Sequence, residues 1–322
     1  MDCEPFRARD FVITEEGLAL ALVLDGPIDG KLFGTLRYRR DGDRWVKLGT
    51  HEGNRAAESA GLLQRLESLD VSLPAISPDR VVMHLEQRRS LSRLIERAAT
   101  NETLASMPQQ DAIVDPRPAR LARLVEILQR RGIPLDVLGI TGSLLIGAVS
   151  PAGDIDLTIR GTAAFDATRR AVHEAIAAGE LQSLSHADWR TAWERRGSSL
   201  TFDEYRRHQE RKGTQWLIDG TKVDLSLALP TELPTAGRKI GRRTIRARIL
   251  DDRHAFALPA RWQVEHAEIT EILTWTATFT GQVRCGETCL AIGTVERTTD
   301  GSLRLLIGAD REAADDRLVL VD

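Results

Sequence analysis

The stretch from residue 138 to residue 159 constrains the fold of this chain more than any other. It reads Leu-Gly-Ile-Thr-Gly-Ser-Leu-Leu-Ile-Gly-Ala-Val-Ser-Pro-Ala-Gly-Asp-Ile-Asp-Leu-Thr-Ile. Apolar residues surround a Gly-Ser pair, and a Ser-Pro-Ala-Gly turn leads into Asp-Ile-Asp. This order predicts a strand, a short apolar helix over residues 144–149, a turn and a second strand.

Gly142 and Ser143 form a candidate phosphate-binding turn. A helix start presents free backbone N–H groups, and a glycine before it lets phosphates approach the backbone closely. The alternative is that Ser143 belongs to an ordinary helix cap without a ligand.

Asp154 and Asp156 form a candidate metal site. Side chains two residues apart on a strand point to the same face, so both carboxylates face one way while Ile155 faces the core. Two close negative charges repel each other unless cations lie between them. Two divalent ions bound to phosphates meet this need, and a solvated turn at a strand edge is the alternative.

Asp224 is the candidate third acid. It is the single acid in the apolar stretch Lys222-Val-Asp-Leu-Ser-Leu227, and an unpaired buried carboxylate is costly. If this strand pairs beside the first, Asp154 and Asp156 would hold two Mg²⁺ or Mn²⁺ ions. Asp224 would hold one ion and help to deprotonate an attacking hydroxyl.

These residues resemble the nucleotidyltransferase superfamily that includes DNA polymerase β, CCA-adding enzymes and poly(A) polymerases. The family pattern is a hydrophobic residue, Gly, Gly or Ser, a spacer, Asp-hydrophobic-Asp and a distant third acid on a strand. Ser143 and Asp154 are separated by ten residues, 144–153. The resemblance covers about 120 residues and implies transfer of a nucleoside monophosphate from an NTP, with release of pyrophosphate.

The whole chain also resembles a group of predicted prokaryotic, largely archaeal nucleotidyltransferases. That likeness depends on three stretches: residues 138–157, residues 200–213, and Arg-Asp-Phe-Val at residues 9–12 with the strands that follow. It indicates the fold more than the substrate.

Two basic segments are candidate contacts for the nucleotide and for nucleic acid. In residues 205–212, Lys212 and Arg211 would bind the triphosphate, and Arg207 with His208 would lie along the acceptor; the alternative is a solvated helix face. The stretch 237–250 contains six cations and no acid. Five arginines there would follow a phosphate backbone, unless the segment is a linker with surface charges: Arg238, Arg242, Arg243, Arg246 and Arg248.

The elements indicate an α+β chain with three domains. Residues 1–110 form an N-terminal α+β domain that includes a predicted helix over 55–69. Residues 111–236 form the nucleotidyltransferase domain, a mixed sheet with helices. Residues 237–322 form a β-rich domain with strands that include 269–280, for which a small β-barrel resembling the OB-fold is expected.

Composition narrows the class of protein. The 322 residues carry 44 Lys and Arg against 47 Asp and Glu, for a net charge of −3, and 42% are hydrophobic, which is ordinary for a folded domain. There is no run of about 18 apolar residues and no signal-peptide pattern. An odd count of three cysteines favours the reducing cytoplasm over a disulfide framework.

We therefore expect a cytoplasmic nucleotidyltransferase with an NTP substrate and an RNA acceptor, such as tRNA, because of the two basic segments. Three alternatives stay open. The same site could modify a protein side chain or a small molecule, or it could join nucleotides into a short or cyclic product. The chain could also be a non-catalytic RNA-binding module, although a site that had lost its activity would have no reason to retain all three acids.

Overall fold

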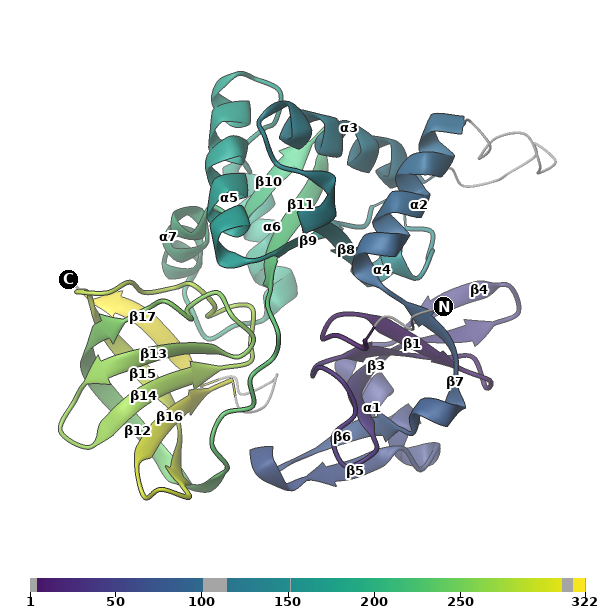
Figure 1. Cartoon of the computed structure of the whole chain (residues 1–322). Coiled ribbons are helices and arrows are strands. Elements are labelled where there is room, and N and C mark those ends of the chain that lie inside the picture. Colours follow the sequence, from purple (N-terminus) through teal and green to yellow (C-terminus); the bar gives the residue numbers. More distant parts are fainter. Residues whose placement is uncertain (1–4, 101–114, 151, 309–314, 322) are drawn as a thin grey trace. The chain divides into compact units, whose positions relative to one another are not determined.

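The computed structural model describes residues 5–100, 115–150, 152–308 and 315–321, and its elements are labelled in Figure 1. The protein is a mixed α and β chain, which confirms the broad fold class expected from the sequence. It divides into two compact units. Unit 1 comprises Met1–Arg65, Ser72–Ser183 and Trp216–Pro230, and unit 2 comprises Leu66–Val71, Leu184–Gln215 and Thr231–Asp322.

The N-terminal sheet has seven strands in the order β5-β6-β3-β2-β1-β7, with β4 paired to β3. Alternating apolar residues of β2 and β3 build its core, in which Leu20 and Leu32 are 0% exposed. The strands are β1 (Phe11–Thr14), β2 (Leu18–Leu22), β3 (Leu32–Asp41), β4 (Arg44–Lys47), β5 (Leu63–Leu66), β6 (Val71–Ile76) and β7 (Val81–Leu85). The helices of this region are α1 (Thr50–Ser59), η1 (Glu67–Leu69), η2 (Pro78–Arg80) and α2 (Gln87–Thr100).

The helix predicted over residues 55–69 is wrong. Helix α1 begins at Thr50 and ends at Ser59, and Leu63–Leu66 is strand β5. Gly61 has a φ of +65°, a left-handed conformation that ends helices and that glycine adopts without strain.

A four-stranded sheet in unit 1 carries the predicted site. Its order is β10-β11-β9-β8, with β9 parallel to β11 and antiparallel to β8. The strands are β8 (Leu138–Thr141), β9 (Ile155–Arg160), β10 (Gln215–Ile218) and β11 (Thr221–Ala228). The helices are α3 (Arg117–Arg130), η3 (Leu135–Val137), α4 (Gly142–Leu145) and α5 (Thr162–Ala177). Helix α5 packs on β9 and contacts α3, and α2 packs on β8 (Figure 1).

Helix α4 is shorter than the 144–149 helix predicted from the sequence. It begins at Gly142 and ends at Leu145, and Gly147 has a φ of +72°. The glycine stops the helix after one turn, so residues 148–150 lie outside any helix.

In its described residues, unit 2 contains the α-helices α6 and α7, the short helix η1 and a six-stranded sheet. The order is β12-β13-β14-β16-β15-β17, and β12 also pairs with β15. Its elements are α6 (His186–Arg196), α7 (Phe202–Lys212), β12 (Gly237–Asp251), β13 (Ala260–Glu265), β14 (Ile269–Thr274), β15 (Thr288–Thr298), β16 (Leu303–Ile307) and β17 (Arg317–Val321). The strand expected over 269–280 ends at Thr274.

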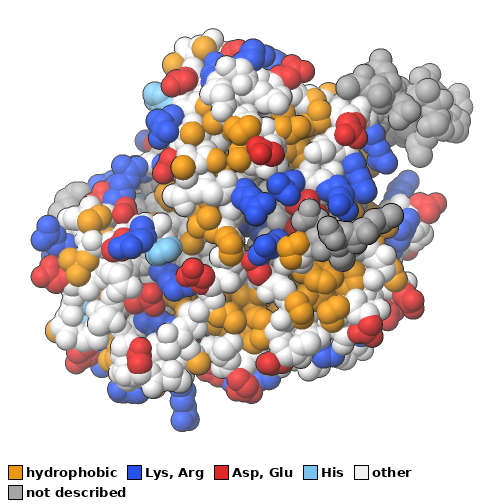
Figure 2. Space-filling model, in the orientation of Figure 1, with side chains coloured by type: hydrophobic (Ala, Val, Ile, Leu, Met, Phe, Trp, Pro, Cys, Tyr) orange, Lys and Arg blue, Asp and Glu red, His pale blue; other side chains and the backbone are white. Residues whose placement is uncertain are grey.

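The described residues contain no helix that is long and apolar enough to cross a membrane. On the face shown in Figure 2, Lys and Arg side chains are interspersed with Asp and Glu, in keeping with the net charge of −3.

Candidate active site

Two neighbouring parallel strands hold acidic residues of the predicted site. β9 and β11 pair so that Asp156 lies directly opposite Asp224. Ile155 and Val223, which precede these acids, are 0% exposed, so the two carboxyl groups share the opposite face. Paired strands run about 4.8 Å apart. The structure thus brings the distant third acid beside the Asp-Ile-Asp sequence.

Lys222 connects Asp224 to Asp154, which precedes β9 by one residue. Its Nζ lies 3.3 Å from Oδ2 of Asp154 and donates a hydrogen bond to Oδ2 of Asp224. The side chains of all three residues are between 14% and 25% exposed. One ammonium group therefore offsets part of the charge that the acids bring together.

Asp156 is strongly perturbed by this environment. Burial is the main reason that the pKa of its carboxyl rises to about 7, and the negative charges of Asp224 and Asp154 add to the rise. The positive charges of Lys222 and Lys47 act in the opposite direction. Burial and the two neighbouring acids therefore outweigh the two lysines, and Asp156 holds its proton more tightly than a free aspartate does.

The chemistry of these side chains fits divalent cations. Mg²⁺ and Mn²⁺ prefer carboxylate ligands, and the Lys222 ammonium shows that two of the acids already stabilise a positive charge. Among the residues that the structure describes, no three His, Cys, Asp or Glu side chains are arranged to hold a metal ion. Metal binding by all three acids therefore requires the Lys222 ammonium to move aside.

Gly142 lies against the carboxylate of Asp156. Its φ is +68°, and a Cβ atom at this position would lie 2.1 Å from Oδ2 of Asp156. Both the backbone conformation and the contact demand glycine. The Gly-Ser turn and the acidic residues, which are separate features in the sequence, thus meet in one site.

Arg117 at the start of α3 is a site residue that the sequence analysis missed. Its side chain is 0% exposed. It donates hydrogen bonds to the hydroxyl of Ser143, to the carbonyl of Ala148 at 2.7 Å and to the carbonyl of Asp154 at 3.4 Å. Asp115 binds the guanidinium Nε at 2.9 Å and offsets its charge. Arg117 therefore fixes the loop between the Gly-Ser turn and the first acid.

The N-terminal sheet also contributes to this site. Tyr38 of β3 is 4% exposed and hydrogen-bonds Ser143. The Arg9 guanidinium donates to the carbonyl of Leu227 in β11, and its own carbonyl accepts a 2.7 Å hydrogen bond from Thr141.

Arg9 and Lys47 bring positive charge to the acids. Burial lowers the pKa of Arg9 to about 10, and the negative charge of Asp156 opposes that change. The charge of Lys47 lowers the pKa of Asp156. Only the Arg-Asp-Phe-Val stretch, noted for its resemblance, indicated this region in the sequence.

The predicted nucleotide contacts on α7 lie in unit 2. Lys212 is 3% exposed and donates a 2.6 Å hydrogen bond to the carbonyl of Thr278, and burial lowers its pKa well below the usual value. Arg211 pairs with Glu287, whereas Arg207 is exposed. The structure therefore uses Lys212 inside unit 2, where it helps to hold α7.

The predicted nucleic-acid contacts lie on β12 of unit 2, and all are exposed: Arg238, Arg242, Arg243, Arg246 and Arg248. Arg242 pairs with Asp316 at 2.7 Å and Arg243 pairs with Glu268, which reduces the charge that these two arginines offer. Arg246 and Arg248 lie on the exposed face of β12, and the residues between and beside them are buried on the other face.

Comparison with curated proteins finds that this chain is similar to an archaeal protein along almost its whole length. No family model and no solved structure matches this chain. The chain is 26% identical over 331 positions to an uncharacterized protein of Methanocaldococcus jannaschii, and the alignment covers 95% of this chain and 96% of that protein. The similarity therefore extends over both units.

Proposed function

We propose that this protein is a metal-dependent nucleotidyltransferase that transfers a nucleoside monophosphate from an NTP to an acceptor hydroxyl and releases pyrophosphate. The observation that carries the proposal is the placement of Asp156 beside Asp224, with Gly142 in contact with the Asp156 carboxylate. Paired acids next to a glycine turn suit a reaction in which cations and phosphates must be held together.

Asp154 and Asp156 would hold two Mg²⁺ or Mn²⁺ ions, and Asp224 would hold one of them. When bound, these ions supply the positive charge that stabilises the developing charge on the α-phosphate and on the leaving pyrophosphate.

The protein's own groups would bind and orient the reactants. The glycine at position 142 lets phosphates approach the backbone, and Arg9 and Lys47, which already interact with Asp156, would pair with phosphate oxygens. As the acceptor oxygen bonds to the α-phosphorus and the bond to pyrophosphate breaks, a carboxylate oxygen of Asp224 would accept the hydroxyl proton.

The finer details of the fold and location belong to the same proposal. The four-stranded sheet is proposed to be a polymerase-β-like core, and the continuous pairing of β12, β13, β14, β16 and β15 supports a small OB-like barrel in unit 2. The free thiols of Cys285 and Cys289 support a reducing compartment such as the cytoplasm.

RNA, such as tRNA, is the proposed acceptor because exposed arginines lie on β12. The experiment incubates the protein with each α-³²P-labelled NTP, Mg²⁺ or Mn²⁺, and separate pools of tRNA, protein and no acceptor. Label on tRNA that Asp156→Asn abolishes supports the proposal. Label on protein, or a soluble product without acceptor, would contradict the RNA assignment, and no transfer under any condition would contradict nucleotidyl transfer.

A further inference from the structure

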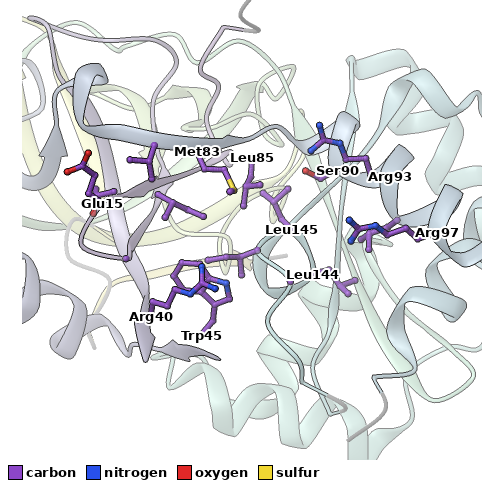
Figure 3. Close-up of a pocket in the computed structure, with 17 residues that line it drawn as sticks. Glu15, Arg40, Trp45, Met83, Leu85, Ser90, Arg93, Arg97, Leu144 and Leu145 are labelled. Carbon is purple, nitrogen blue, oxygen red and sulfur yellow. The ribbon is translucent and has the colours of Figure 1, made fainter. Parts of the chain in front are cut away.

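An open groove in unit 1 has a volume of about 450 Å³, which is within the range of ligand sites. It lies among the N-terminal sheet, helix α2 and the segment 144–147. In Figure 3, Arg93 and Arg97 come from the helix, Arg40 and Trp45 come from the β3–β4 hairpin, and Met83 and Leu145 lie between them. None of these side chains belongs to the acidic site described above.

The groove carries positive charge on two sides. Arg93 and Arg97 are both exposed and stand one helical turn apart on α2, so their side chains project in similar directions. Arg40 is exposed on the hairpin side. Glu15 is the single acid among the described residues that line the groove. An anionic ligand is therefore favoured.

The surface between the arginines is aromatic and aliphatic. The Arg40 guanidinium lies 5.5 Å from the ring centroid of Trp45. Val82 and Met83 on β7, which also line the groove, are 55% and 51% exposed. A ligand for this groove must therefore offer flat apolar faces in addition to negative charge.

The groove and the acidic site share two elements. Helix α4 presents Ser143 to Arg117 and Tyr38, and its next residues, Leu144 and Leu145, line the groove. On β3, Tyr38 and Arg40 are two residues apart, a distance of about 7 Å along a strand. The same two elements therefore build both the groove and the surroundings of Ser143 beside the proposed reaction centre.

We propose that this groove binds the single-stranded end of the RNA acceptor, which rests on the proposed function. Bases would stack on Trp45 and pack against Met83, while Arg93 and Arg97 would pair with backbone phosphates. Single-stranded nucleic acid is the polyanion whose repeat combines planar apolar faces with one charge per unit, which matches the alternation of arginines and apolar side chains.

The test measures binding of a fluorescein-labelled 12-nucleotide single-stranded RNA by fluorescence anisotropy at several salt concentrations. The groove variants are Arg93→Ala/Arg97→Ala, Trp45→Ala and Trp45→Phe. The matched control is Arg55→Ala/Arg170→Ala, which removes two exposed arginines from helices α1 and α5 outside the groove. Circular dichroism and thermal unfolding check that each variant is folded.

We expect the double-arginine variant to bind RNA at least about tenfold more weakly with a shallower salt dependence, because phosphate contacts release counterions. Trp45→Ala should lose about tenfold, and Trp45→Phe should keep most of the affinity because it retains a stacking face. The control should stay within about twofold of the wild type. Equal losses in the control and the groove variants, or no loss in the groove variants, would overturn the proposal.

Two further arms separate this inference from the proposed function. Asp156→Asn should bind the RNA as the wild type does while losing transfer. Absence of transfer by the wild-type protein, with groove-dependent RNA binding intact, would refute the enzyme and leave the groove site standing. Efficient transfer to RNA by the groove variants would refute the groove alone. Equally tight, groove-dependent binding of a 12-base-pair duplex, or full displacement by inorganic tripolyphosphate at equal phosphate concentration, would contradict base stacking.

Discussion

Position 142 imposes two constraints that only glycine can meet. Its φ of +68° and the 2.1 Å approach of a Cβ atom to Asp156 predict that Gly142→Ala shifts the carboxylate and destabilises the protein by about 1–3 kcal/mol. Gly132→Ala is the control, because Gly132 has a φ of +79° but nothing within 4 Å of a Cβ atom. Urea unfolding and label transfer measure both effects. Loss of transfer in both variants would contradict the proposed role of the contact.

Lys222 is one of five lysines in the chain, and it occupies the position that connects two acids. We expect Lys222→Ala to lower the free energy of unfolding in EDTA by about 2 kcal/mol, since charged hydrogen bonds are lost and the carboxylates repel each other. Mn²⁺ should then stabilise the variant more than the wild type, as measured by thermal unfolding. Equal stabilisation of both proteins by Mn²⁺ would show that Lys222 does not compete with the cation.

Arg117 is a buried cation that pairs with Asp115 and donates hydrogen bonds to Ser143, Ala148 and Asp154. Arg117→Met leaves Asp115 uncompensated and should cost about 3–5 kcal/mol of unfolding free energy. Arg123→Met on the same helix removes an exposed pair with Asp219, whose side chains are 51% and 38% exposed, and should cost at most about 1 kcal/mol. Chemical denaturation compares the two variants. Similar losses would mean that the buried network contributes little.

At the scale of elements, α7 buries polar side chains inside unit 2. His208 is 2% exposed, and its Nε2 accepts a 3.3 Å hydrogen bond from the backbone N–H of Leu320. Burial, with help from the charges of Lys212 and Arg211, lowers the pKa of His208 to about 4.

This pKa predicts how stability depends on pH. Because the unfolded state takes up a proton near the ordinary histidine pKa of about 6.5 and the folded state only near 4, stability falls as pH decreases between these values. The contribution reaches up to about 3 kcal/mol. Urea unfolding from pH 7 to pH 4 should show a smaller decrease for His208→Gln than for the control His173→Gln, which changes an exposed histidine. Parallel curves would contradict the assignment.

The sequence predicts local elements better than contacts between them. Hydrophobic runs and turn residues predict the order of β8, α4 and β9 and the strand β11. The apolar residues beside each acid indicate on which face of the sheet that acid lies. The helix over 55–69 is wrong because Ala60, Leu63 and Leu66 have helical spacing on both sides of a left-handed Gly61. Periodicity alone does not register a break in backbone conformation.

At the scale of the whole molecule, the site depends on residues far apart in the chain. Tyr38 reaches Ser143 and Arg9 reaches Leu227, contacts that depend on how two sheets pack rather than on any local pattern. The role of Arg117 is likewise not predictable from the sequence, because an arginine in a polar stretch is expected at the surface, whereas this one is buried. The residues of α6 and α7, which the sequence places in the central domain, are grouped with unit 2.

The central claim is that Asp154, Asp156 and Asp224 form one site for metal-dependent nucleotidyl transfer. The most direct measurement is the rate of transfer from α-³²P-labelled NTP to tRNA by the wild type, Asp224→Asn and the control Asp166→Asn, whose acid lies on α5 with its side chain 47% exposed. We predict transfer that requires Mg²⁺ or Mn²⁺, falls roughly 100-fold or more in Asp224→Asn and is unchanged in Asp166→Asn. Equal rates for the wild type and Asp224→Asn would contradict the claim.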